Sequence, residues 1–146
     1  MAVEGSCVSL VIGTLLDVVI EEPPRGLLHW SSAKLFLLGV LIAPIVETVL
    51  FQLLPILVAR TLGGRYKVSL AVSVILFAGV HFLEGMAVGI AAGIVGGFYL
   101  TSVFLWWVET SYWTAVWTTA LSHMVRNSVA ATMLTLLRAA LPEIAL

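Results

Sequence analysis

Four ionisable residues lie deep within the long apolar stretches of this 146-residue sequence, and three uncharged polar residues lie around them. The ionisable residues are Glu47, His81, His123 and Arg126, and the uncharged ones are Thr48, Gln52 and Asn127. A carboxylate and an imidazole can activate a water molecule by taking its proton, and an imidazole and an amide can donate hydrogen bonds to an oxyanion. Ionisable residues deep within apolar segments are costly and commonly mark function. These residues therefore mark a candidate functional site if the fold brings them together.

The composition predicts an integral membrane protein whose surroundings are the lipid bilayer. Hydrophobic residues make up 61% of the chain and charged residues 10%, against about 45–50% and about 25% in soluble domains. A chain this short buries too little of its surface to hide so much apolar area. The net charge of −1 argues against a nucleic-acid partner. The single cysteine, Cys7, excludes a disulfide framework and a Cys-rich zinc site.

Four apolar stretches have about the length of a membrane span, which requires roughly 20 residues. Only helices and closed barrels satisfy their backbone within lipid, and the short connections here favour helices. Ser31 or Ser32 is expected to cap the first helix. The prediction is an all-α fold, a multi-pass transmembrane helical bundle with four core helices. Their expected positions are 33–59, 68–83, 86–107 and 112–137.

A shorter apolar segment, residues 6–20, precedes the four stretches and either spans the bilayer or lies in its interface. We divide the chain into an N-terminal segment with its linker, 1–32, and a core, 33–141. The first residues carry no basic region, so no removable signal peptide is expected. Basic residues are shared equally between the two sides of the bundle, and both membrane orientations remain open.

The helical rise places the polar residues at one depth in the membrane. At about 1.5 Å per residue, Glu47 lies about 20 Å from the turn that contains Arg60. His81 lies about 21 Å from the same side of the membrane, and His123 and Asn127 lie about 16 and 22 Å from it. Three separate helices would therefore bring their polar groups together.

Three motifs around these residues resemble those of a known family. The motifs are Glu47-Thr48-Val49-Leu50-Phe51-Gln52, Phe77-Ala78-Gly79-Val80-His81 and His123-Met124-Val125-Arg126-Asn127. They are similar to the motifs Glu-Glu-x-x-x-Arg, Phe-x-x-x-His and His-x-x-x-Asn of the CAAX prenyl protease and bacteriocin-processing (Abi) family of glutamate intramembrane proteases. The second and third motifs match fully, and the first matches at its leading Glu.

The resemblance implies an intramembrane endopeptidase that cleaves a peptide or a membrane-protein substrate. By analogy, Glu47 and His81 would activate water, and His123 and Asn127 would stabilise the oxyanion. No cofactor is then expected. In an alternative reading, Glu47, His81 and His123 would bind Zn²⁺ as in a metalloprotease, with an open position for water. In a non-enzyme alternative, the chain is an inactive membrane scaffold that binds a peptide or a partner protein.

The first motif departs from the family pattern at two positions. Thr48 stands in place of the second Glu, and Gln52 in place of the Arg. The two positions are four residues apart and so share a helix face. We interpret the change as the replacement of a charge pair by a neutral hydroxyl–amide pair, which costs less to bury.

Several other residues are expected to support the bundle rather than the chemistry. Phe77 is predicted to pack against the His81 ring, and Pro44 and Pro55 are predicted to kink the first helix and free carbonyl groups. Arg126 is expected to reach towards the membrane interface or to pair with Glu84. A glycine ridge in the third span is expected to pack within the chain or to mediate self-association. It comprises Gly85, Gly89, Gly93 and Gly97.

Overall fold

The computed structural model describes residues 8, 11–13, 15–16 and 31–140. All regular structure in these ranges is helical and no strand occurs among them, which confirms the predicted all-α class. Cys7, most of the predicted segment 6–20, the linker as far as residue 30 and the end of the core at residue 141 lie outside the described residues.

The first long helix runs from Ser32 to Thr61 and alternates between two kinds of winding. Ser31 caps its beginning, as predicted, because its Oγ accepts a hydrogen bond of 3.3 Å from the Lys34 amide. Two stretches are π-helical, with hydrogen bonds that reach back five residues instead of four. In chain order the parts are α2 (Ser32–Lys34), η2 (Leu35–Ile42), α3 (Ala43–Glu47), η3 (Thr48–Leu53) and α4 (Leu54–Thr61).

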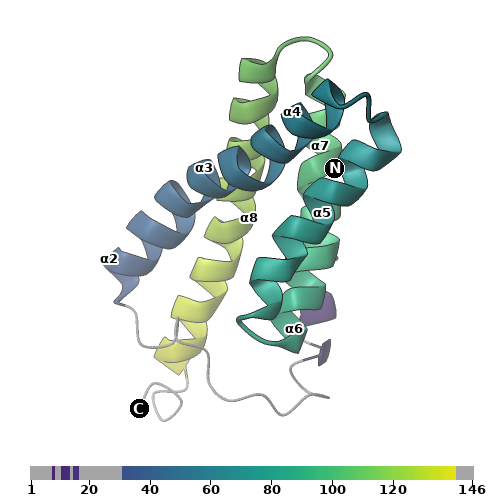
Figure 1. Cartoon of the computed structure of the whole chain (residues 1–146). Helices are drawn as coiled ribbons and strands as arrows, with labels where there is room; N and C mark the ends of the chain where they lie inside the picture. The colour runs from purple at the N-terminus through teal and green to yellow at the C-terminus, as the bar shows by residue number, and fades with distance from the viewer. Residues whose placement is uncertain (1–7, 9–10, 14, 17–30, 141–146) are drawn as a thin grey trace.

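Three further helices complete the described bundle, and all four lie within three residues of the predicted positions. The turns before the second and third contain Gly63 and Gly85, whose φ angles of 81° and 130° favour glycine. Figure 1 shows the first long helix crossing the last one obliquely, while the other two lie side by side. These helices are α5 (Tyr66–Phe82), the continuous run of α6 (Met86–Val88), η4 (Gly89–Gly96) and α7 (Gly97–Trp107), and α8 (Tyr112–Ala140).

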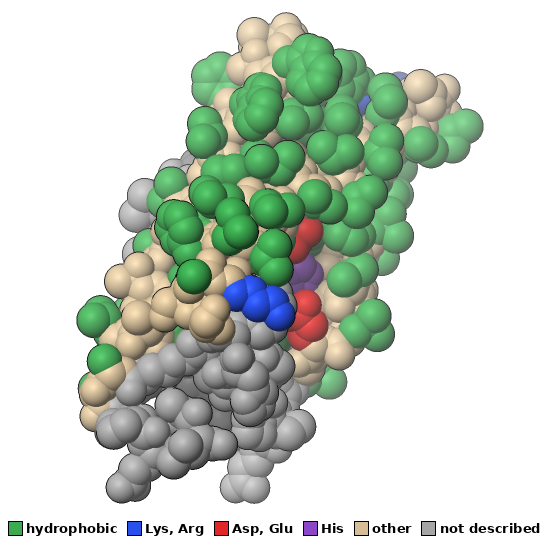
Figure 2. Space-filling model, turned by 90° about the vertical axis from the view of Figure 1, so that its left-hand side faces the viewer, with side chains coloured by type: hydrophobic (Ala, Val, Ile, Leu, Met, Phe, Trp, Pro, Cys, Tyr) green, Lys and Arg blue, Asp and Glu red, His purple; other side chains and the backbone are tan. Residues whose placement is uncertain are grey.

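Two of the described helices are long and apolar enough to cross a membrane, Ser32–Thr61 and Met86–Trp107. Helix α5 is apolar but has 17 residues, fewer than the roughly 20 that span the hydrocarbon core. Large apolar side chains also lie on the outside of the bundle, among them Ile75 at 67% and Leu121 at 57% exposure. Figure 2 shows such side chains over most of one face.

Pro44 and Pro55 account for the changes of winding in the first helix. A proline has no backbone N–H, and its ring clashes with the carbonyl four residues earlier. At both sites the residue before the proline donates to the carbonyl five residues back, which widens the turn. These bonds run from Ala43 N–H to Leu38 O and from Leu54 N–H to Val49 O.

A buried serine on α5 compensates for the donor that Pro55 lacks. Ser73 Oγ donates a hydrogen bond of 2.6 Å to Phe51 O, the carbonyl four residues before this proline. Because the Ser73 proton is used there, Thr101 on α7 donates to Ser73 Oγ over 2.8 Å. Both hydroxyl side chains are fully buried. This relay connects three helices through one backbone carbonyl.

Glycines allow the third helix to approach α5 closely, so the predicted packing of the glycine ridge within the chain is confirmed. A Cβ atom on Gly93 would lie 2.8 Å from Ala78 Cα, closer than real Cβ contacts. The face that self-association would use is therefore occupied by α5, while Gly85 lies in the preceding turn. The other two contacts are those of Gly89 with the Phe82 ring and of Gly97 with the Phe77 ring.

An apolar cluster closes the end of the bundle at the turn between α7 and α8. It joins α4, α7 and α8, and beside it Arg60 pairs with Glu109 at the surface. This end is packed by apolar side chains, whereas the candidate catalytic residues lie nearer the other end. The cluster consists of Ile56, Phe104, Leu105, Val108, Ala115 and Val116.

We expect Ser73→Ala to lower the free energy of unfolding by about 1–3 kcal/mol, because a buried carbonyl loses its donor. The measurement is unfolding of the purified protein in detergent micelles. Ser122→Ala is the matched control, since Ser122 Oγ bonds to Thr118 O of its own helix, a bond that adds little stability. Equal stability of the two variants would contradict the role given to Ser73.

Candidate active site

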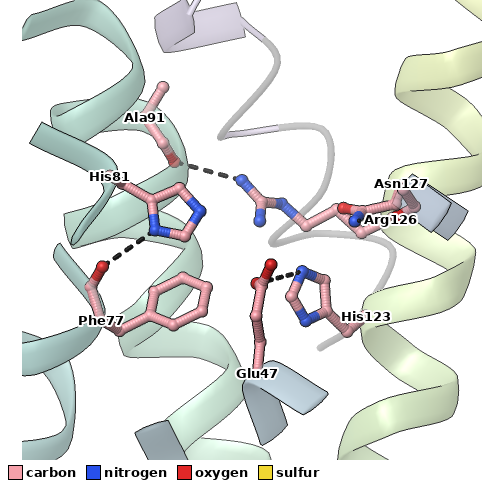
Figure 3. A network of polar contacts seen from close by, with 8 residues as sticks. Glu47, Phe77, His81, Ala91, His123, Arg126 and Asn127 are labelled. Atoms are coloured by element: carbon pink, nitrogen blue, oxygen red, sulfur yellow. Dashed lines mark hydrogen bonds and ion pairs between the residues drawn. The ribbon is translucent and has the colours of Figure 1, made fainter. Parts of the chain in front are cut away.

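Three helices bring Glu47, His81 and His123 to one place in the bundle. Glu47 ends α3, between the two π-helical stretches, His81 lies near the end of α5, and His123 lies within α8. Figure 3 shows the carboxylate and the two imidazoles around a common space. The convergence that the helical rise predicts is therefore present in the structure.

Glu47 and His123 form the closest contact among these groups. Glu47 Oε2 lies 3.7 Å from His123 Nε2, longer than a direct hydrogen bond but within range of electrostatic attraction. The Glu47 side chain is 26% exposed and that of His123 is 2% exposed. The pair thus joins a group that reaches the outside of the bundle to one that is enclosed.

A backbone hydrogen bond fixes the tautomer of His81. Its Nδ1 lies 2.9 Å from Phe77 O, and a carbonyl oxygen can only accept. Nδ1 therefore carries the proton, and in the neutral ring Nε2 keeps its lone pair. Figure 3 shows the second ring nitrogen pointing into the space shared with Glu47. This nitrogen can accept a proton from water.

Phe77 is fully buried and packs against both imidazoles. Its ring centroid lies 4.3 Å from that of His81 and 5.9 Å from that of His123. Phe51 packs edge-on against the same ring at 5.7 Å. Phe77 thus holds the two histidines in place, the packing role that the sequence predicts.

Asn127 is placed differently from the other three candidates. Its Nδ2 donates a hydrogen bond of 2.8 Å to Gly39 O. Gly39 lies five residues before Pro44, so in the π-helical register its partner would be the N–H that proline lacks. The amide therefore satisfies a carbonyl freed by Pro44, as Ser73 does near Pro55. The structure does not direct this bond towards Glu47 or His81.

Thr48 and Gln52 are both fully buried on η3 but do not form the expected hydroxyl–amide pair. Within the part of the chain that the structure describes, Thr48 Oγ1 and both polar atoms of the Gln52 amide have no hydrogen-bond partner. The interpretation of a hydrogen-bonded replacement for a charge pair is thus wrong in its geometry. Both residues remain neutral polar groups in the core.

Arg126 lies beside the site residues, between α8 and the third helix. Its Nη2 donates to Ala91 O over 3.4 Å, and its guanidinium packs against Gly96. The missing side chain of Gly96 gives the guanidinium room between helices. A charged residue next to Asn127 within an apolar helix was the available signal in the sequence.

Among residues 31–140 and the few described before them, no three His, Cys, Asp or Glu side chains are grouped closely enough to hold a metal ion. Glu47 and His123 are adjacent, whereas His81 packs on the Phe77 ring and faces the same space. The hydrogen bond to Phe77 O would nevertheless suit His81 as a metal ligand, since ligating histidines commonly donate their second N–H to a carbonyl.

Comparison with protein-family models, curated proteins and solved structures finds no match for this chain. The functional proposal therefore depends on the three motifs and on the geometry of the residues within them.

We expect Asn127→Ala to destabilise the fold, because Gly39 O loses its donor. In a Pro44→Ala background the loss should be smaller, since alanine restores a backbone N–H to the first helix. The measurement is a double-mutant cycle on unfolding in detergent, with an expected coupling of about 0.5–3 kcal/mol. Strict additivity of the two substitutions would show that Asn127 does not compensate for Pro44.

Proposed function

We propose that this chain is a multi-pass intramembrane endopeptidase of the CAAX protease and Abi type. The observation that carries the proposal is the meeting of Glu47, His81 and His123, from three helices, beside one common space. An ionisable cluster within apolar helices is expensive to maintain unless it has a function. The order and spacing of these residues in the three sequence motifs support the same proposal.

The membrane location is supported by the outside of the bundle as well as by two helices of sufficient length. Large exposed apolar side chains occur on each of the four helices, and continuous apolar surface of this kind needs a partner or lipid. Figure 2 shows acidic, histidine and basic side chains reaching the surface at one break in this apolar cover. A peptide within the membrane would meet the site there. One exposed example from each helix is Leu37, Ile75, Ile94 and Leu121.

The proposed reaction is hydrolysis of a peptide bond by an activated water molecule. Glu47 or His81 Nε2 accepts one proton of the water as its oxygen bonds to the carbonyl carbon. His123, on the opposite side of the carboxylate, helps to position the reacting groups. The C–N bond then breaks, and the proton passes to the amine that leaves. The low dielectric of the apolar surroundings strengthens every electrostatic interaction in these steps.

We expect Glu47→Gln to abolish cleavage while the protein still folds, because the amide cannot accept a proton from water. The measurement is comparative peptidomics of cells that express the wild type or the variant. Glu109→Gln is the control, since Glu109 lies at the far end of the bundle in a surface pair with Arg60, and such pairs add little stability.

Peptides that depend on Glu47 but not on Glu109 would support the protease assignment. Identical peptides from the wild type and Glu47→Gln would assign the protein to the alternative class, a membrane scaffold or peptide-binding protein.

We expect metal chelators to leave the cleavage rate of the purified protein unchanged, because a carboxylate and an imidazole can activate water without an ion. The assay compares cleavage before and after chelation and after Zn²⁺ is added back. Inhibition that Zn²⁺ reverses would favour the metalloprotease alternative and make Glu47, His81 and His123 its ligands.

A further inference from the structure

Arg126 brings a positive charge into the candidate active site from α8. Figure 3 shows its guanidinium on the same side as the Glu47 carboxylate and beside His81. The hydrogen bond from Nη2 to Ala91 O fixes the group against the third helix.

Gly96 makes this position of the guanidinium possible. A Cβ atom on Gly96 would lie 2.6 Å from Arg126 Cζ and from Nη1, far inside normal contact. Any larger residue at position 96 would therefore displace the guanidinium. The guanidinium therefore occupies space that is open only because Gly96 has no side chain.

The placement of Arg126 contrasts with that of its neighbour Asn127. The Asn127 amide donates to Gly39 O, the carbonyl freed by Pro44. Arg126 Nη2 donates instead to Ala91 O on the third helix. Of these two adjacent side chains, Arg126 is the one that faces the Glu47 carboxylate (Figure 3).

We propose that Arg126 makes this site an anion-binding site, and that its guanidinium holds the oxyanion of the tetrahedral intermediate. The inference rests on the proposed function and assigns to Arg126 the charge stabilisation that the family resemblance gives to His123 and Asn127. Asn127 is then a positioning residue that holds the first helix, and with it Glu47, against α8.

The step balances without a further reactant. The water oxygen bonds to the carbonyl carbon while its proton passes to Glu47 or His81, and the electron pair of the C=O double bond moves onto oxygen. Arg126 faces that negative charge with charge-assisted hydrogen bonds, which are shorter and stronger than neutral ones. When the electron pair on that oxygen forms the C=O double bond again, the C–N bond breaks, and the leaving amine takes up the proton held by Glu47 or His81.

Binding of dodecylphosphonate to the purified protein in detergent tests the anion site without any substrate. This probe joins a tetrahedral anion to an apolar chain, and dodecanol is its uncharged control. We expect Arg126→Gln to weaken phosphonate binding about ten- to a hundredfold, the effect of losing one charge-assisted hydrogen bond. Dodecanol binding should not change.

Gly96→Ala tests the same inference while the charge is kept. The new methyl group displaces only the flexible end of Arg126, so the fold should persist while phosphonate binding weakens. Gly79→Ala is the matched control, since among the described residues no atom outside the adjacent residues and the surrounding helix backbone lies within 4 Å of its added Cβ. If Arg126→Gln does not fold, phosphonate binding by Gly96→Ala tests the proposal. Unchanged phosphonate affinity in Gly96→Ala or Arg126→Gln would overturn the proposal.

A cleavage assay distinguishes failure of the anion site from failure of the proposed protease function. Loss of one oxyanion donor should lower the rate of cleavage by about 10²–10³-fold, whereas Gly79→Ala should cleave as the wild type does. Cleavage that requires Glu47 but persists in Arg126→Gln would overturn the role of Arg126 alone. Phosphonate binding that requires Arg126, in a protein without Glu47-dependent cleavage, would retain the anion site and refute the protease.

Discussion

Two backbone carbonyls of the first long helix lack their usual donors because Pro44 and Pro55 have no N–H, and the bundle is arranged around their replacement. In apolar surroundings an unpaired carbonyl costs several kcal/mol. Ser73 on α5 donates to Phe51 O, and Asn127 on α8 donates to Gly39 O. The same prolines set the π-helical stretches on either side of α3, at whose end Glu47 lies. Satisfying the backbone therefore also places the carboxylate.

The position of the carboxylate determines what the two histidines can do. Phe77 packs against both imidazoles, and its carbonyl fixes the proton of His81 on Nδ1. His123 is enclosed, whereas Glu47 is partly exposed. A substrate would approach from the Glu47 side. The glycine contacts between η4 and α5 keep this half of the site closely packed.

The helices and the meeting of their polar residues can be predicted from the sequence, because they depend only on the lengths of the apolar stretches and on the helical rise. Apolar stretches predict the four helices, and the rise per residue predicts that Glu47 and the two histidines meet. The partner of Asn127 could not be predicted, since it depends on which carbonyl the π-helical register frees. The position of Arg126 depends on how closely Gly96 approaches α8. The burial of Thr48 and Gln52 without a mutual hydrogen bond depends on side-chain packing. The spacing of apolar residues in the sequence predicts neither of these features.

The most direct test of the proposed hydrolysis is to follow the oxygen atom of the attacking water. Purified protein would cleave a peptide identified by the peptidomic comparison, in water labelled with heavy oxygen, and mass spectrometry would examine the new carboxyl terminus. With the wild type we predict one labelled oxygen in that carboxylate, and with Glu47→Gln we predict no cleaved product. Labelled product formed at the same rate by Glu47→Gln would contradict the central claim that this carboxylate activates the water.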